Sequence, residues 1–389
     1  MKAEPRVVTL GEVATVQSGF AFKSSQWTES GVPVVKIANV KSGRIDLGSN
    51  QSFVSEADAE KAARFRLKQG DIVIGMTGYV GEVAQVRTNE HLLLNQRVGL
   101  VQIDESKVDR QYLFHLMSGE AFRSEAKGLA YGSAQPNISP SLLHLIEIPL
   151  PPLEEQRAIA ATLGALDDKI ESNRRATAVG ESLIRALVES ALDASEGADG
   201  TLGDYCSLVK APVKVEDISA EDNYIGLEHM PRGSIFLTEW EKAQGLGSNK
   251  TAFQRGDVLF GKLRPYFKKV GIAPVDGVCS TDILAVRPKD PRDIALIAVV
   301  AASDALIDSL SAGSTGTRMP RASWKDLAAW QVPVLTPTER AELSERVAPL
   351  IGRLEQLTFE SRRLAALRDA LLPELLSGRM DVLAEGVAA

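Results

Sequence analysis

The chain contains its own sequence twice, and this duplication constrains the fold more than any other feature. The repeated motifs are TLGE at 9–12 and TLGD at 201–204, GDIVIG at 70–75 and GDVLFG at 256–261, and IPL at 148–150 and VPV at 332–334. The offsets lie between 184 and 192 residues, close to half of the 389-residue chain. A repeat of this length is a whole domain with its connection, not a solenoid unit of a few dozen residues. Two similar domains in one chain predict a pseudo-symmetric molecule with two related surfaces, the geometry that a two-part target requires.

Composition indicates an ordinary soluble protein. The chain is 44% hydrophobic and 24% charged, and its first residues lack the apolar segment of a signal peptide. The longest apolar run, residues 294–302, is far shorter than the roughly 20 residues that span a bilayer. Cys206 and Cys279 have no partner pattern, so we interpret both as buried thiols of a cytoplasmic protein in a reducing compartment.

Net charge argues against a simple nucleic-acid binder. The formal value is −7. Residues 1–152 carry 16 basic and 16 acidic side chains, and residues 195–336 carry 16 and 18. The bulk electrostatic signature of DNA binding is therefore missing. A DNA-facing surface has to be a local patch, or a partner has to supply most of the phosphate contacts.

Each copy begins with a globular stretch of short strands and helices, which predicts the α+β class. In the first copy we expect strands within 32–40, 71–76 and 91–103 and a helix within 110–127. In the second copy we expect strands within 224–227, 257–262, 270–273 and 283–287 and a helix within 292–310. The segment TGYVG at 77–81 is expected to turn, because its glycines supply positive φ or close backbone approach.

A proline-rich break closes each copy and begins a long helix. PLPP at 149–152 and PVLTP at 333–337 are each followed by glutamate, which complements the positive end of a helix. The chain is therefore divided into globular domain 1 at 1–150, a first long helix at 151–195, globular domain 2 at 196–333, a second long helix at 334–380 and a tail at 381–389.

Both predicted helices carry apolar residues spaced alternately four and three apart, as a heptad seam requires. The seam positions are Ile159, Leu163, Leu166 and Ile170 in the first helix and Leu343, Val347, Leu350, Leu354 and Leu357 in the second. Such a seam has to be buried, either against the helix's own globular domain or, as we favour, against the other helix in an antiparallel pair. The pair would be a spacer of roughly 60 Å, at about 1.5 Å per residue, between the two domains.

No catalytic centre is recognisable in the sequence. There is no GxxxxGK[ST] phosphate loop, no GxSxG nucleophile turn and no Asn-Pro-Pro-aromatic run typical of amino-methyltransferases. The four histidines His91, His115, His144 and His229 lack any metal-ligand spacing, so we expect no metal site. The glycine-rich segment 312–317 is interpreted as a flexible loop, with approach to a phosphate backbone as the alternative.

Two clusters in the second copy are free of acids and combine cations with aromatic rings, which suits contact with phosphates and bases. The first cluster supplies the candidate DNA-binding residues Lys262, Arg264, Tyr266, Lys268 and Lys269. The second cluster, beside a tryptophan, supplies Arg318, Arg321 and Lys325. Arginine can address guanine through two hydrogen bonds. A solvated turn between two strands is the alternative interpretation of the first cluster.

The first copy has different side chains at the corresponding places. Its loop at 130–137 aligns with the glycine-rich loop of the second copy, and supplies the candidates Tyr131, Gln135 and Asn137. The two amides can read adenine, or they can be turn residues. A separate basic stretch supplies the candidates Lys36, Lys41 and Arg44. Similar surfaces built from different side chains are what two distinct half-sites require.

With these features, the chain resembles the specificity subunit of type I restriction–modification systems across nearly its full length. The motifs that carry the resemblance are TLGEVA at 9–14, GDIVI at 70–74, and IPLPPLEEQR at 148–157 followed by the heptad helix. The counterpart of the last motif in the second copy, TPTER at 336–340, is a reduced version of it.

The resemblance implies a non-catalytic subunit with two target-recognition domains, each binding half of a bipartite double-stranded DNA sequence. It implies that these domains are related by a pseudo-two-fold axis and separated by the two antiparallel helices. It further implies that two methyltransferase subunits dock on the helices and bring S-adenosylmethionine, and that restriction subunits add reactions driven by ATP and Mg. No cofactor is expected on this chain itself.

Two alternatives stay open. One is an enzyme, such as a fused nuclease or methyltransferase, which the missing motifs disfavour. The other is an adaptor whose two lobes bind proteins only, and the acidic net charge is its best support.

Overall fold

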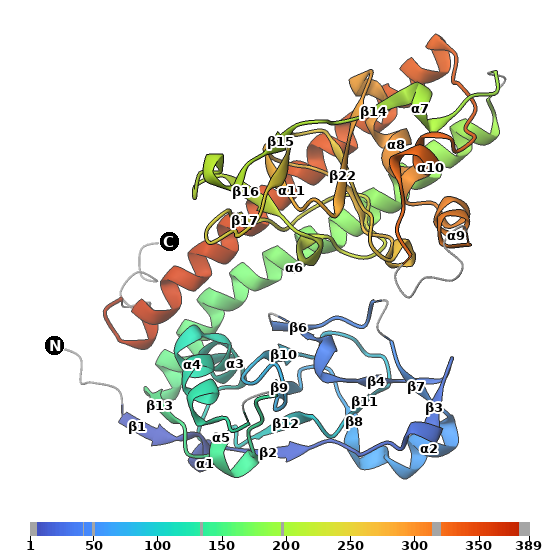
Figure 1. The fold of residues 1–389 in the computed structure, drawn as a ribbon. Coiled ribbons are helices and arrows are strands. Elements are labelled where there is room, and N and C mark those ends of the chain that lie inside the picture. Colours follow the sequence, from blue (N-terminus) through green and yellow to red (C-terminus); the bar gives the residue numbers. More distant parts are fainter. Residues whose placement is uncertain are drawn as a thin grey trace. The chain divides into compact units, whose positions relative to one another are not determined.

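The computed structural model describes residues 6–41, 43–48, 51–132, 135–195, 198–312 and 320–380 (Figure 1). The chain divides into two compact units, residues 1–170 with 363–389 (the first unit) and residues 171–362 (the second unit). Each unit contains one copy of the repeat and mixes helices with sheets, so the expected α+β class with a duplicated domain is confirmed. The division differs from the expected five parts, because each long helix is shared between the units instead of forming a part of its own. The expected tail at 381–389 lies outside the described residues.

The first unit contains two larger sheets and a two-stranded ladder. The six-stranded sheet has the order β2 (Ala14–Ser18), β12 (Val98–Ile103), β9 (Ile72–Gly75), β10 (Val83–Gln85), β6 (Gly43–Ile45) and β5 (Val40–Lys41). The five-stranded sheet has the order β3 (Trp27–Thr28), β7 (Phe53–Val54), β4 (Val32–Val35), β11 (Leu92–Leu94) and β8 (Arg66–Leu67). The ladder pairs β1 (Arg6–Thr9) with β13 (Glu147–Leu150).

The helix expected over 110–127 is broken in two by a glycine. Its parts are α3 (Arg110–Ser118) and α4 (Glu120–Leu129), and the remaining short helices of this globular part are α1 (Leu10–Val13), α2 (Glu56–Lys61) and α5 (Pro140–Leu143). Gly119 between α3 and α4 is extended, with φ −71° and ψ 153°. A Cβ at this position would lie 3.0 Å from Leu372. The break therefore lies where the backbone comes close to the second long helix.

The second unit repeats this plan with a smaller first sheet. The four-stranded sheet has the order β14 (Cys206–Leu208), β22 (Ile283–Pro288), β19 (Val258–Gly261) and β20 (Val270–Ile272). The five-stranded sheet has the order β15 (Pro212–Val213), β18 (Lys250–Phe253), β21 (Gly277–Cys279), β16 (Asn223–Ile225) and β17 (Glu241–Lys242). The short helices are α7 (Leu202–Tyr205), α8 (Ile294–Ala301), α9 (Asp304–Ala312) and α10 (Trp324–Ala328).

The helix expected over 292–310 is the bent pair α8 and α9, whose axes differ by 58°. Residues 295–301 of α8 are buried in the core of the second unit. In the part of the chain that the structure describes, no single helix has the length and apolar character to cross a membrane, and this bent pair is the one combination that has both.

The two copies share their strand topology. The antiparallel run β2-β12-β9-β10 corresponds to β14-β22-β19-β20, and the parallel pair β4–β11 corresponds to β16–β21. They differ at a sheet edge: β3 adds to β7 in the first unit, whereas β15 adds to β18, on the opposite side, in the second unit. The duplication seen in the sequence is therefore a duplication of topology that has diverged at the periphery.

The repeated motifs have the same structural role in both copies. In the TLG motif, the N–H of Thr9 donates to the carboxylate of Glu12 (2.8 Å) and the N–H of Thr201 donates to that of Asp204 (2.7 Å). Each of these carboxylates closes a capping box at the start of a short helix. The conservative change from Glu to Asp keeps this function.

The Gly-Asp motif makes the turn that enters β9 or β19. Gly70 and Gly256 both have φ +89°, a conformation that strains other residues. The carboxylates of Asp71 and Asp257 each accept a hydrogen bond of 2.8 Å from the N–H three residues earlier. Positive φ explains why glycine stands at this position in both copies.

The long helices are α6 (Leu153–Asp193) and α11 (Pro337–Leu376). In the first unit, Ile159 and Leu163 are buried in one cluster with the globular core and with Leu375 of α11. In the second unit, Ile184 of α6 shares a cluster with Val347 of α11 and with the strands of the sheet. The seam positions that are fully buried are Ile159, Leu163, Ile170, Leu343, Val347, Leu354 and Leu357, while Leu166 and Leu350 are half-buried. The seam therefore packs both on the other long helix and on the globular core, so the two expected modes of burial occur at the same time.

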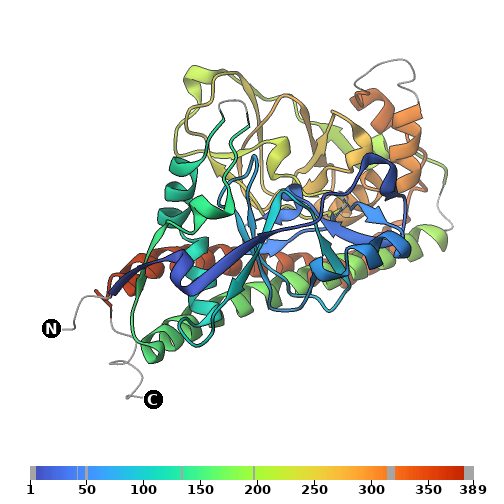
Figure 2. The ribbon, with the colours of Figure 1, turned by 90° about the horizontal axis from the view of Figure 1, so that it is seen from below.

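Contacts between α6 and α11 establish their antiparallel direction (Figures 1 and 2). In the second unit, the amide of Asn173 donates to the side chains of Glu360 (2.9 Å) and Ser361 (3.3 Å). A Cβ on Gly180 would lie 2.7 Å from Leu354. As residue numbers rise along α6 they fall along α11, so the helices run in opposite directions.

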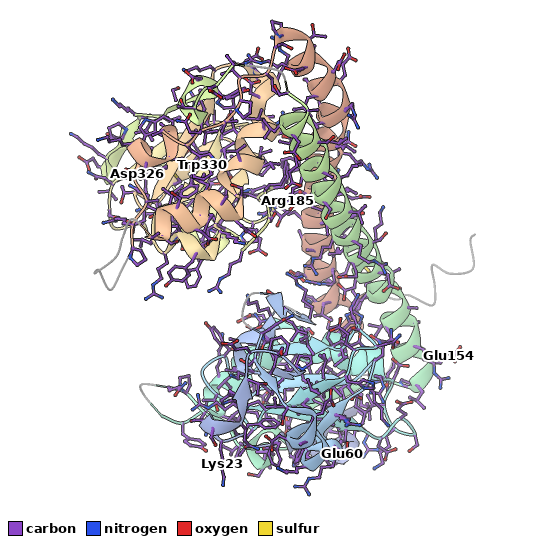
Figure 3. All side chains as sticks on the ribbon, turned by 90° about the vertical axis from the view of Figure 1, so that its right-hand side faces the viewer. Lys23, Glu60, Glu154, Arg185, Asp326 and Trp330 are labelled. Carbon is purple, nitrogen blue, oxygen red and sulfur yellow. The ribbon has the colours of Figure 1, made fainter. Side chains whose placement is uncertain are left out.

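Polar contacts attach α6 to the globular part of the second unit. The guanidinium of Arg185, labelled in Figure 3, donates to the carbonyl of Gly233 (2.7 Å). The buried carboxylate of Glu181 accepts from the hydroxyl of Ser234 (2.6 Å) and the N–H of Ile235 (3.2 Å). Burial raises the pKa of Glu181. At the other end of α6, Glu154 is exposed (Figure 3) in the first turn, where an acid suits the helix dipole.

Candidate nucleic-acid interface

In the second unit, the first candidate cluster forms the loop between β19 and β20. Residues 265–267 make one turn of 3-10 helix, bounded on both sides by residues with positive φ. These residues are Arg264 (φ 51°) and Lys268 (φ 49°), and among the residues that the structure describes no other non-glycine residue has positive φ. An L-amino acid in this region costs about 1–2 kcal/mol. The loop is therefore strained at two cationic residues.

The second cluster lies directly against this loop. The N–H of Arg264 donates to the carbonyl of Pro320 (3.0 Å), and the N–H of Ala322 donates to that of Lys262 (2.9 Å). Arg321 is thus held beside the strained turn by a backbone ladder. Lys325 is exposed on α10 next to Asp326 (Figure 3). Arg318 lies outside the described residues.

Several of the candidate cations have partners within the protein. The ammonium of Lys268 pairs with the carboxylate of Asp304, and the guanidinium of Arg321 pairs with that of Asp282. The ammonium of Lys269 donates to the carbonyl of Leu227. The cluster contains no acidic residue in its own sequence, but the fold brings Asp304 and Asp282 beside its cations.

The turn also displays aromatic rings. Tyr266 is 48% exposed and meets the ring of Phe267 edge to face, with centroids 4.7 Å apart. The guanidinium of Arg232 lies over the Phe267 ring at 3.8 Å. Beneath the turn is a cavity of about 250 Å³, lined by Leu227, Leu263, Arg264, Phe267 and Lys269. Its walls are mainly apolar and its cations belong to the candidate cluster.

The first unit builds the equivalent loop between β9 and β10 with the same backbone ladder. The N–H of Gly78 donates to the carbonyl of Pro136 (2.8 Å), and the N–H of Ile138 donates to that of Met76 (2.9 Å). The ladder aligns Gly78 with Arg264. The two positive-φ positions of this loop are Gly78 (φ 75°) and Gly81 (φ 80°). Glycine therefore stands in the first unit where the second unit has strained cations.

The candidate amides of the first unit differ in their surroundings. Asn137 is engaged at both ends: its carbonyl oxygen accepts from the Thr77 hydroxyl (2.7 Å), and its nitrogen donates to the Tyr131 hydroxyl (3.1 Å). Its side chain fits the structural role of a turn residue. Gln135 is exposed next to Gly78 and is the amide better placed to meet a base.

Sequence reasoning did not select Tyr79, which is 63% exposed at the tip of this loop. Counted back from the second positive-φ residue of each loop, Gly81 or Lys268, it is the counterpart of the exposed Tyr266. Tyr131, on the adjoining segment, is 55% exposed. An alignment of the two β-hairpin sequences, in place of a search for cations alone, could have identified Tyr79.

The basic stretch of the first unit lies at the neighbouring sheet edge. The ammonium of Lys36 is 3.6 Å from the centre of the Trp27 ring, and burial lowers the pKa of this lysine. Lys41 pairs with Asp46 at 3.1 Å. Arg44 lies on β6 opposite Gln85 of β10. Lys41 and Arg44 therefore lie on β5 and β6, at the edge of the sheet that contains β9 and β10, whereas Lys36 follows β4 of the five-stranded sheet. Lys36 and Lys41 are already engaged.

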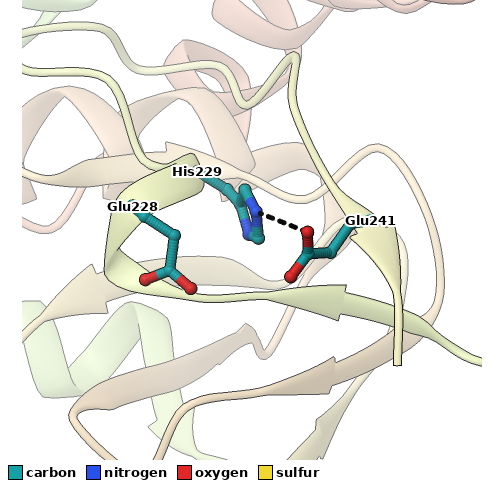
Figure 4. A group of neighbouring side chains, drawn as sticks. All are labelled: Glu228, His229 and Glu241. Carbon is teal, nitrogen blue, oxygen red and sulfur yellow. Dashed lines mark ion pairs between the residues drawn. The ribbon is translucent and has the colours of Figure 1, made fainter. Parts of the chain in front are cut away.

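A possible cation site appears in the second unit, where Glu228, His229 and Glu241 converge (Figure 4). Nε2 of His229 is 3.7 Å from the Glu241 carboxylate, and its Nδ1 accepts from the N–H of Gly226 (3.0 Å). Asn39 accepts from the N–H of Lys36 in the same way in the first unit (2.9 Å). The role of this histidine is therefore to cap a short turn. The group offers three ligand atoms, two of them on exposed glutamates, which is fewer than the four that a structural zinc site uses.

Comparison with known proteins is consistent with this geometry. Residues 4–179 match a family model described as the type I restriction modification DNA specificity domain. The chain is 39% identical over 174 residues to the type I restriction enzyme MjaVIII specificity subunit of Methanocaldococcus jannaschii, covering 43% of this chain and 41% of that one. It is 28% identical over 169 residues to the EcoBI specificity subunit of Escherichia coli, covering 43% and 33%. The resemblance seen in the motifs is thereby confirmed, over less than half the length of these relatives.

A solved structure extends the similarity of fold to nearly the whole chain. The crystal structure of the type I restriction–modification system S subunit from M. genitalium matches with a TM-score of 0.55 at 17% identity and covers 95% of both chains. At this identity the match concerns the fold alone. It agrees with a chain that contains two globular copies and two long helices.

Proposed function

We propose that this chain is the non-catalytic DNA-specificity subunit of a type I restriction–modification complex. Each unit recognises one half of a bipartite double-stranded target. Support comes from the specificity domain matched over residues 4–179 and from the repeat of its topology in the second copy. The relatives named above are specificity subunits of such enzymes.

The observation that carries this proposal is the pair of equivalent loops, β9–β10 and β19–β20. Both are fixed by the same backbone ladder to a neighbouring segment, and both expose a tyrosine. Their other side chains differ, with glycines in the first unit and an arginine and lysines in the second. A common frame with different side chains is suited to reading two different base sequences, because base edges are distinguished by the donors and acceptors that meet them.

The long helices are proposed to bind two methyltransferase subunits, which carry S-adenosylmethionine, and to join restriction subunits that use ATP and Mg. The balanced charge of the globular copies supports a role for such partners. Candidate cations such as Lys268 and Arg321 are already paired with carboxylates, so much of the contact with phosphates would come from other subunits.

Mapping of methylated bases tests this function. The chain is expressed together with the methyltransferase subunit of its own system in a host that lacks both. We expect a methylated two-part motif, with a fixed gap of unspecified bases, that appears only when both proteins are present. Methylation that does not depend on this chain would contradict the proposal. An adaptor that binds proteins alone predicts that result.

A further inference from the structure

We propose that Arg264 reads a guanine in the half-site of the second unit, from a turn whose strained backbone is retained because it aims the guanidinium. This inference rests on the proposed function and assigns one residue to it. It follows from the comparison of the two β-hairpin loops, from the surroundings of Arg264 and from the geometry that guanine recognition needs.

The strain at Arg264 has no structural necessity. The ladder that aligns Gly78 with Arg264 shows that the same turn can be built with glycine, which takes positive φ without a steric penalty. The second unit nevertheless has arginine here, at φ 51°. Residues held in unfavourable backbone regions concentrate where the strain is part of a function. Glycine at position 264 would relieve the strain and remove nothing but the side chain. The arginine side chain is therefore what is kept here in spite of the strain.

The guanidinium of Arg264 is also open to a ligand, unlike three other cations at this turn. Lys268 and Arg321 pair with Asp304 and Asp282. Lys269 donates to a backbone carbonyl. Arg264 is exposed, and among the described residues its guanidinium meets an aromatic ring, that of Phe267 at 5.8 Å, and no carboxylate within ion-pair distance.

The geometry favours a base edge over a phosphate. Contact with a phosphate tolerates a flexible cation, whereas the two parallel bonds of arginine to guanine O6 and N7 require the planar fork at a defined angle. The backbone on both sides of Arg264 is fixed, by its bond to Pro320 and by the 3-10 turn that follows. The cavity at the turn is lined by Leu227, Leu263 and Phe267 together with Arg264 and Lys269, so its walls are mainly apolar and contain no acidic side chain to pair with the guanidinium.

Three variants of the full chain, assembled with its methyltransferase partner, test the proposal. Arg264→Gly removes the cation and the strain, Arg264→Ala removes the cation and keeps the strain, and Arg264→Lys keeps the charge and loses the fork. Affinity is measured by fluorescence anisotropy on duplexes that carry the mapped target, and on duplexes in which each guanine of one half-site is replaced in turn by 7-deazaguanine, which lacks N7. Thermal midpoints are measured on the same proteins.

We expect all three variants to bind the target about 5- to 100-fold more weakly, the effect of losing one bidentate pair. One 7-deazaguanine, in the half-site of the second unit, should weaken the wild type and leave Arg264→Gly unchanged. The thermal midpoint of Arg264→Gly should lie at or above that of the wild type, and above that of Arg264→Ala. A stable Arg264→Gly variant with unaltered affinity would overturn the proposal.

Two other results would also overturn it. A loss of affinity that is uniform across sequences, with a shallower salt dependence, would identify a phosphate contact. A lower midpoint for Arg264→Gly than for Arg264→Ala would show that the turn is not strained. Failure of the proposed function is separate and visible beforehand, because the wild-type complex would then have no bipartite target to bind.

Discussion

Replacement of Arg368 by methionine should destabilise the first unit strongly, because it strands a buried carboxylate. Asp167 of α6 is 8% exposed, and its carboxylate accepts a 2.7 Å bond from the Arg368 guanidinium of α11. His115 of α3 lies 3.7 Å from the same carboxylate. Removal of one partner of a buried pair costs about 3–5 kcal/mol, since the remaining charge has lost its compensation. Methionine keeps most of the aliphatic stem, so the loss is chiefly electrostatic.

We expect the free energy of unfolding of the first unit to fall by about 3 kcal/mol at pH 7. Urea denaturation of the full chain measures this loss, and hydrogen exchange shows that the affected transition belongs to the first unit. Burial lowers the pKa of His115, and Arg368 lowers it further. In Arg368→Met this pKa should rise, so that imidazolium can pair with Asp167 and the destabilisation shrinks as the pH falls. Arg363→Met, an exposed position on the same helix, is the control and should change stability by less than about 0.5 kcal/mol.

The double variant Asp167→Leu with Arg368→Met should recover much of the lost stability, because no buried charge is then left alone. A single-variant loss below about 1 kcal/mol, or strictly additive effects in the cycle, would refute the view that this pair joins α6 and α11 in the first unit. Additivity is the expectation for residues that do not interact.

Three further outcomes are expected. Gly70→Ala should lower the free energy of unfolding by about 1–2 kcal/mol, because Gly70 has a φ of +89°. Gly164→Ala, inside α6 with open space around the residue, should raise it by roughly 1 kcal/mol. Denaturation curves of the two variants, measured in parallel, test both expectations. Burial lowers the pKa of His115 to about 4 against about 6.5 unfolded, so stability of the first unit should fall by up to roughly 3 kcal/mol as pH drops from 6.5 to 4, and this slope should vanish in His115→Leu. Charge reversal at both Lys262 and Arg264 should weaken binding of the second half-site only, as measured by gel-shift titration; equal loss at both half-sites would remove these residues from a specific interface.

The sequence predicted the features that depend on local pattern. Heptad spacing located α6 and α11 within a few residues, because an apolar stripe of this period can only be a buried helix face. Gly70 and Gly256 marked equivalent turns, because positive φ leaves a trace in residue type. The duplication then supplied the correspondence between the two sheets.

Features that depend on contacts distant in sequence were not predictable. Nothing near Lys268 in the sequence indicates its pairing with Asp304, and nothing near His229 indicates Glu241. The strain at Arg264 was hidden for a different reason, since arginine gives no sign of left-handed backbone.

The sequence also does not show that each long helix is shared between the two units. The seam residues were assigned to a separate helical part because their spacing indicates a helix partner. In the structure Ile159 and Ile184 contact a globular core as well. A heptad pattern specifies that a face is buried, and the sequence alone does not specify how many neighbours share the burial.

The central claim is that two copies of one fold read two separate half-sites. Exchange of residues 204–332 for the same segment of a homologous chain, followed by mapping of methylated bases, tests it most directly. We predict that one half of the methylated motif changes, while the other half stays as it is. A change in both halves, or in neither, would contradict the assignment of one half-site to each unit.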